Sequence, residues 1–143
     1  MTTVLVFGTF DLVHPGHIDF FRQAKKHGKR LIVVVARDKT IENVKGEMPK
    51  FDELTRLDAV SSVPEVDKAV LGSEGDKYEI IRDMDPDVIC LGYDQFVFVD
   101  ELEDKLKSFD MDIKILRMKA HKPEKYKSGL LKPHYHEPVM QDS

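Results

Sequence analysis

The chain has 143 residues, 41% of them apolar and 34% charged, which is enough for one hydrophobic core and too little for a second domain of ordinary size. Its 26 acidic residues outnumber its 22 basic ones, and the net charge of −4 excludes the overall positive field typical of proteins that bind nucleic acid or anionic membranes. The single cysteine, Cys90, excludes an intramolecular disulfide.

The N-terminal sequence favours a protein that stays in the cytoplasm. It enters an apolar run without a preceding basic segment or a cleavage site of small residues. No apolar run approaches the roughly 18 residues that a membrane span needs. We therefore expect a soluble cytoplasmic protein with neither membrane nor nucleic acid as a partner.

Apolar, β-branched runs alternate along the chain with stretches of helical periodicity. The runs predict strands at 4–7, 31–36, 66–71, 88–91 and 113–116, and their unbroken apolar character is typical of strands buried on both faces of a parallel sheet. Amphipathic stretches at 18–24, 54–60, 78–84 and 99–109 predict four helices between them. This alternation predicts a single α/β domain with a Rossmann-like, doubly wound, five-stranded parallel sheet in the order 3-2-1-4-5.

The end of the chain differs from the rest in charge and composition. The segment from Lys114 to Lys132 has a net charge of +6 and the remainder −10, so an anionic ligand would find cations there. We expect the domain to span residues 1–132 and residues 133–143, which contain two prolines, to form a disordered tail. His134 and His136 in this tail could bind a metal; two exposed histidines without a third ligand is the simpler interpretation.

The strongest local signal is the segment Gly8-Thr9-Phe10-Asp11-Leu12-Val13-His14-Pro15-Gly16-His17, between the first expected strand and the first expected helix. In a doubly wound fold, ligands bind beyond the carboxyl ends of the strands. Gly8 would let the chain turn sharply off the strand. Gly16 would leave room for a ligand at a helix N-terminus, whose unpaired N–H groups attract anions.

The two histidines of this segment are three residues apart. Both imidazoles can therefore face one side at the start of the helix and add N–H donors to a phosphate site. The structural alternative is that His14 only caps the helix and that His17 packs against Phe21.

This motif resembles that of the HxGH nucleotidyltransferase superfamily, and residues 3–131 resemble its cytidylyltransferase-like branch. Within the branch the sequence is most similar to archaeal-type FAD synthetases. The likeness is carried by Val35-Ala36-Arg37-Asp38 leading to Val44-Lys45-Gly46, by Val66-Asp67-Lys68-Ala69-Val70-Leu71-Gly72-Ser73, and by Leu91-Gly92-Tyr93-Asp94-Gln95. These three segments point to flavin-forming members and not to glycerol-phosphate ones.

The resemblance implies that ATP binds along the first motif. Backbone groups of Thr9 and Phe10, and the run His14-Pro15-Gly16-His17, would contact the nucleotide, with both histidines catalytic. Asp94 would accept hydrogen bonds from ribose hydroxyls or an exocyclic amine, or else be a turn residue that caps the next helix. Asp11 would orient a histidine or hold metal-bound water, unless it is a plain turn residue.

Two further positions are implied to be catalytic. Lys45, in an expected Val-Lys-Gly turn, would meet the acceptor phosphate, or else be a solvated loop lysine. Arg56 would clamp phosphate oxygens, or else be a surface arginine paired with Glu53 or Asp52. The flavin ring would be bordered by aromatic side chains, for which Phe51, Phe96 and Phe98 are candidates.

The sequence departs from the family pattern near its C-terminus. Relatives place an arginine and a turn rich in Ser and Thr after the last strand, where hydroxyl groups receive the departing phosphates. Here Ser128 is followed by Gly129, and Arg117 and Lys119 lie upstream. Ser128 and Tyr126 would then contact ATP, the tyrosine by stacking on the adenosine or by a hydrogen bond to it.

The reaction implied is transfer of AMP from ATP to FMN, giving FAD and pyrophosphate by in-line attack of the FMN phosphate on the α-phosphorus. A divalent ion, Mg²⁺ or else Co²⁺ or Mn²⁺, would be held largely by phosphates. One alternative is a CTP-dependent cytidylyltransferase acting on glycerol 3-phosphate or a similar phosphorylated alcohol. Another is a non-catalytic nucleotide-binding module. A homodimer is the default assembly for such a domain.

Overall fold

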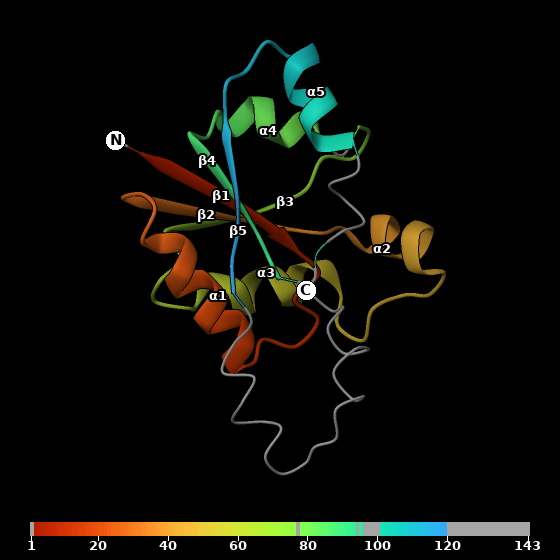
Figure 1. Ribbon diagram of the computed structural model, residues 1–143. Coiled ribbons are helices and arrows are strands. Elements are labelled where there is room, and N and C mark those ends of the chain that lie inside the picture. Colours follow the sequence, from red (N-terminus) through yellow and green to blue (C-terminus); the bar gives the residue numbers. More distant parts are fainter. Residues whose placement is uncertain (1, 77, 94, 96–100, 120–143) are drawn as a thin grey trace, which may run out of the picture.

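Five parallel strands in the order β3-β2-β1-β4-β5 form the centre of the computed structural model (Figure 1). The structure describes residues 2–76, 78–93, 95 and 101–119, without the side chains of residues 44 and 45. The strands are β1 (Thr3–Gly8), β2 (Arg30–Val35), β3 (Lys68–Leu71), β4 (Val88–Leu91) and β5 (Lys114–Arg117). The helices are α1 (Pro15–Lys25), α2 (Asp38–Lys45), α3 (Glu53–Ser61), α4 (Glu79–Met84) and α5 (Leu102–Ser108).

The sheet carries a core layer on each face. Alternate residues of a strand point to opposite faces, so Val4 and Val6 join one buried cluster while Leu5 and Phe7 join the other. Helices α1 and α3 lie on the first face and α4 and α5 on the second (Figure 1). The predicted doubly wound fold and strand order are confirmed.

Two features of the fold differ from the prediction. Burial on both faces holds for β1, β2 and β4, but β3 and β5 are only half-buried because each is an edge strand with one neighbour. Helix α2 was not predicted, since its apolar residues are too few to form a stripe. Lys45 is consequently the last residue of α2 and not part of a turn, and Gly46 leaves the helix in a left-handed conformation with φ 83°.

All five strands run in the same direction, so the segments that follow them gather at one edge of the sheet. The strand order reverses at β1, with β2 and β3 on one side and β4 and β5 on the other. The motif that begins at Gly8 therefore lies at the position where doubly wound folds bind ligands. The expected tail, residues 133–143, lies outside the described residues.

Candidate active site

A bulky residue in a left-handed backbone conformation shapes the loop after β1. Phe10 has φ 52°, which costs a non-glycine residue about 1 kcal/mol or more, and its side chain is completely buried. Its ring folds back over Gly8, where an added Cβ would lie 2.4 Å from Phe10 Cζ. Glycine is needed at position 8, the last residue of β1, because the Phe10 ring fills its side-chain space, and the left-handed residue of the turn that follows is Phe10.

The two histidines form a reciprocal cap on α1. The Gly16 N–H donates to His14 Nδ1 at 3.1 Å, and the His14 N–H donates to His17 Nδ1 at 3.3 Å. The imidazoles are stacked with centroids 3.8 Å apart and planes 22° apart. Gly16 makes room for this cap, because a Cβ there would lie 2.9 Å from His14 Cε1.

This cap determines which ring nitrogen carries the proton. Both Nδ1 atoms accept hydrogen bonds, so in each neutral imidazole the proton is on Nε2. Capping and ligand binding are therefore compatible at His17, because capping uses its Nδ1 and leaves its Nε2–H without a partner among the described residues.

The expectation of unpaired N–H groups at this helix end is wrong. Pro15 has no N–H, the Gly16 N–H is bonded to the His14 ring, and the N–H groups of His17 and Ile18 donate to the His14 carbonyl oxygen. This end of α1 can still attract an anion through the helix dipole and the imidazole donors. It does not resemble a glycine-rich loop with several open backbone amides.

His17 is buried, with 3% of its surface exposed, and packs edge-on against Phe10 at a centroid distance of 5.1 Å. Phe21, which the structural alternative places against His17, packs against the Phe10 ring with centroids 5.3 Å apart. Among the described residues, His17 Nε2 has no hydrogen-bond partner. Burial, together with the charge of His14, lowers the pKa of His17 to about 3, although the Leu12 carbonyl favours the protonated ring. His17 is therefore a neutral donor at physiological pH.

The lowered pKa of His17 predicts a loss of stability in mild acid. The unfolded chain, with a histidine pKa of about 6.5, binds more protons than the folded one between pH 6.5 and pH 3, so stability falls as the pH falls through this window. We expect His17 to account for about 2 kcal/mol of destabilisation between pH 7 and pH 5. Urea unfolding of the wild type and His17→Gln at both pH values measures this, and equal losses in the two proteins would contradict it.

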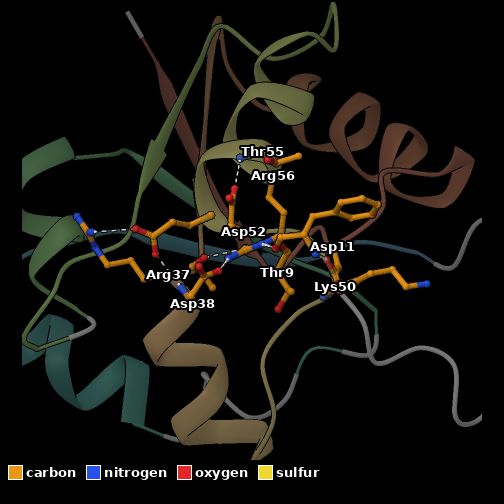
Figure 2. Close-up of polar contacts among 11 residues, drawn as sticks. Thr9, Asp11, Arg37, Asp38, Lys50, Asp52, Thr55 and Arg56 are labelled. Atoms are coloured by element: carbon orange, nitrogen blue, oxygen red, sulfur yellow. Dashed lines mark hydrogen bonds and ion pairs between the residues drawn. The ribbon is translucent and has the colours of Figure 1, made fainter.

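A buried arginine joins four segments at the carboxyl edge of the sheet (Figure 2). Arg56, on α3, is 1% exposed, and its Nη1 donates to the carbonyl oxygens of Thr9 at 2.9 Å and Ala36 at 2.7 Å. Its Nε donates to the Phe51 carbonyl oxygen at 2.9 Å, and its Nη2 pairs with Asp38 Oδ1 at 2.6 Å. The guanidinium thus holds the ends of β1 and β2 against α2 and the 46–52 segment.

The alternative of a surface arginine paired with Glu53 or Asp52 is wrong. Asp52 caps α3 by accepting from the Thr55 N–H at 2.8 Å, and Glu53 Oε1 accepts from the Asp38 N–H at 2.9 Å. The predicted contact of Arg56 with phosphate stays a prediction, although four of the bonds that its guanidinium can make go to the protein itself.

Asp11 connects the histidine loop to a segment about 40 residues away in the sequence. Its two carboxylate oxygens accept from the backbone N–H groups of Lys50 at 2.7 Å and Phe51 at 2.8 Å (Figure 2). It is therefore not a plain turn residue, and it makes none of the described hydrogen bonds to a histidine. Phe51, a predicted neighbour of the flavin, is 38% exposed beside this contact.

On the other side of β1, Arg117 and Gln95 shape the segment after β4. Arg117 Nη1 donates to the carbonyl oxygens of Gly92 at 2.7 Å and Gln95 at 3.0 Å. The Gln95 amide donates to the Phe7 carbonyl oxygen and accepts from the Gly92 N–H, which ties this segment to the end of β1. These positioning roles were not predicted, although Gln95 lies in a segment that carries the family likeness.

Several predicted site residues cannot be placed. Asp94, Tyr126 and Ser128 lie outside the described residues, as do Phe96 and Phe98 and the two tail histidines. The backbone of Lys45 ends α2, while its side chain is not described. Within the described ranges, no three His, Cys, Asp or Glu side chains form a cluster that could hold a metal ion. The same part of the chain contains no helix long and apolar enough to cross a membrane.

Comparisons with known proteins identify the family of this chain. Residues 5–132 match the family model described as Cytidylyltransferase-like. A protein from Methanohalophilus mahii named FAD synthase is 43% identical over 130 residues, 90% of each chain. Another FAD synthase, from Methanococcoides burtonii, is 46% identical over 118 residues, which is 82% of this chain and 81% of the relative.

Solved structures support the same fold. A structure described as a lipopolysaccharide core biosynthesis protein from Thermoplasma volcanium is 42% identical, with a TM-score of 0.80 over 85% of this chain and 99% of that one. Pantoate-beta-alanine ligase from Francisella tularensis shares the fold at 17% identity, with a TM-score of 0.58 over 85% of this chain and 60% of that one.

The fold, with a pair of histidines capping the helix after β1, defines a nucleotidyltransferase, and the chain belongs to the cytidylyltransferase-like family. Within that family the chain is similar to proteins named FAD synthase, which are 40–46% identical to it over most of their length.

Proposed function

We propose that this protein is an FAD synthase, which transfers AMP from ATP to the phosphate of FMN. An oxygen of the FMN phosphate attacks the α-phosphorus of ATP, the bond from that phosphorus to the bridging oxygen breaks, and pyrophosphate leaves. The FMN phosphate, with a second pKa of about 6, is mostly dianionic at neutral pH, so the attack needs no general base.

The observation that carries this proposal is the fixed, neutral and buried imidazole of His17. Its Nδ1 is occupied by the His14 N–H, so Nε2 presents an N–H donor in a site of low dielectric constant. A donor fixed in advance gains most strength when negative charge develops beside it, as on the pentacoordinate phosphorus and the departing pyrophosphate. A neutral imidazole, unlike an imidazolium, also does not release a proton that could bind to the attacking oxygen of the FMN phosphate.

A divalent cation fits this proposal as a companion of the substrate. The described residues form no metal-binding cluster, and both Asp11 oxygens accept backbone N–H groups. We therefore propose that Mg²⁺, or Co²⁺ or Mn²⁺, is held by the phosphates of ATP. Its chemistry there would be to neutralise phosphate charge.

The test is to incubate the purified protein with ATP, FMN and either Mg²⁺ or Co²⁺ and to separate the products by chromatography. We expect FAD and pyrophosphate in equal amounts. CTP with glycerol 3-phosphate, run in parallel, tests the cytidylyltransferase alternative. ATP binding without pyrophosphate release for any acceptor would indicate a non-catalytic module, and turnover of another acceptor without any FAD would overturn the assignment.

We further propose that the protein acts in the cytoplasm as a homodimer. Two-fold dimers are the commonest assemblies of soluble proteins. Burial raises the pKa of the Cys90 thiol to about 12, so this cysteine stays protonated and unreactive inside the sheet. Light scattering coupled to size-exclusion chromatography measures the mass of the particle, and a monomer of 16.4 kDa would contradict the dimer.

A further inference from the structure

The backbone ladder of β1 is complete on one side and short on the other. β1 pairs with β2 over its whole length, and the last register position joins Gly8 to Val35. The pairing of β1 with β4 stops at Leu5 and Ile89, although the two strands run on to Gly8 and Leu91. The ladder therefore ends early between β1 and β4, the two strands at which the strand order reverses.

A glutamine side chain joins β1 and β4 beyond the end of this ladder. The Gln95 amide nitrogen donates to the Phe7 carbonyl oxygen at 3.1 Å, and its amide oxygen accepts from the Gly92 N–H at 3.1 Å. Phe7 belongs to β1, and Gly92 directly follows β4. Because a side-chain amide offers the same donor and acceptor as a peptide group, Gln95 continues the ladder where backbone pairing has ended.

Arg117, the last residue of β5, fixes the turn that ends at this glutamine. Its Nη1 donates to the carbonyl oxygens of Gly92 at 2.7 Å and Gln95 at 3.0 Å. The Gln95 N–H also donates to the Gly92 carbonyl oxygen at 3.2 Å. The N–H and C=O groups of both residues that bound the turn are thus bonded within the protein, and the turn is held by β1, β4 and β5 together.

The Gln95 bridge connects the two segments that are predicted to bind ATP. Phe7 immediately precedes Gly8, where the motif begins whose histidines would contact the phosphates. Asp94, predicted to accept hydrogen bonds from the ribose or the base, immediately precedes Gln95. The bond from Gln95 to Phe7 therefore sets the distance between the segments for the two ends of one ligand. Because hydrogen bonds weaken beyond about 3.2 Å, a small change in that distance would cost contacts at one end.

We propose that Gln95 is a positioning residue for ATP, which acts by holding the turn after β4 at a fixed distance from β1; the assignment rests on the proposed FAD synthase activity. Gln95 need not touch the nucleotide, because both ends of its amide are bonded to backbone groups of the protein. Its loss lets the turn move relative to the histidine loop and weakens the binding of ATP. The binding of FMN does not depend on this turn.

The test removes the two hydrogen bonds and keeps the size of the side chain. Methionine has the length of glutamine without its amide, so Gln95→Met leaves the space filled. We expect the KM for ATP, and the dissociation constant of ATP measured by calorimetry without FMN, to rise about tenfold. The KM for FMN should change less than twofold, and kcat at saturating ATP should be largely retained.

Asp87→Ala is the matched control, because Asp87 joins the same two strands at the opposite edge of the sheet. Its Oδ2 accepts from the Thr3 N–H at 2.8 Å, at the start of β1, and Asp87 directly precedes β4. Both variants therefore lose side-chain bonds between β1 and β4. Asp87→Ala should lower the urea midpoint to an extent similar to Gln95→Met and leave the binding of ATP unchanged.

Three results would overturn the role of Gln95. One is a Gln95→Met protein that binds ATP as tightly as the wild type, and another is a rise confined to the KM for FMN. The third is an equal weakening of ATP binding in Asp87→Ala, which would reduce the effect to a general loss of stability. Wild-type protein that binds ATP but forms no FAD would overturn the proposed function instead, and the calorimetric titrations would still decide the role of Gln95.

Discussion

His17→Ala is expected to lower kcat about 100- to 1000-fold, which is the usual loss when one donor to a developing negative charge is removed. The KM for ATP should change much less, because the donor gains strength mainly in the transition state. Steady-state kinetics of FAD formation, corrected for the folded fraction by circular dichroism, measure both constants.

Two variants separate this role from a purely structural one. His17→Gln keeps an N–H donor near the position of Nε2 and should lose less activity than His17→Ala. His27→Ala changes an exposed histidine after α1 and should leave kcat unaltered. If His17→Ala were to unfold at a lower temperature while each folded molecule kept its full kcat, the histidine would be only a core residue.

Arg56→Ala is expected to lower both stability and turnover. Removing the guanidinium leaves the partly buried Asp38 carboxylate and three carbonyl oxygens without their donor, which should cost about 3 kcal/mol in the free energy of unfolding. Because the Thr9 carbonyl is released, the histidine loop should shift. A displacement of about 1 Å in such a site costs about 100-fold in rate. Urea unfolding and single-turnover kinetics measure the two effects.

The conservative variant and chemical rescue show whether Arg56 acts by positioning. Arg56→Lys keeps the charge but lacks the planar fork of donors, so it should recover stability only in part and kcat hardly at all. Added ethylguanidinium should raise the kcat of Arg56→Ala, whereas ethylammonium should not. The exposed Arg82, paired with Glu79 on α4, is the control. A loss confined to the KM for ATP, with normal stability, would instead support the predicted direct contact with phosphate.

The fold follows almost completely from local patterns in the sequence. Unbroken apolar runs rich in β-branched residues, such as 31–36, indicate strands that are buried on both faces. Because these runs alternate with amphipathic stretches, few arrangements other than a parallel sheet remain. The short helix α2 was missed because a helix held by its neighbours needs little apolar stripe of its own. The partial exposure of the edge strands β3 and β5 was not predicted, because the sequence of a strand does not show how many strands pair with it.

The site was predictable where function depends on residues close together in the sequence. His14 and His17 sit three apart at a helix start, and their stacked rings follow from that spacing and from the small Gly16 between them. Asp11 was singled out without its partners, since Lys50 and Phe51 are about 40 positions away. Gly8 was singled out for the turn that follows the strand, whereas the structure shows that glycine is needed there because the Phe10 ring packs against it.

The sequence alone determined the class of fold and singled out the loop after β1, with its pair of imidazoles, as the predicted ligand site. Only the tertiary structure decided that Arg56 is buried and bonded to groups 5 to 47 positions away, and that the Gln95 side chain bridges β1 and the turn after β4. The physical reason is that periodicity and capping act within a few residues of chain, whereas a buried guanidinium takes its partners from whichever backbone carbonyls folding brings to it.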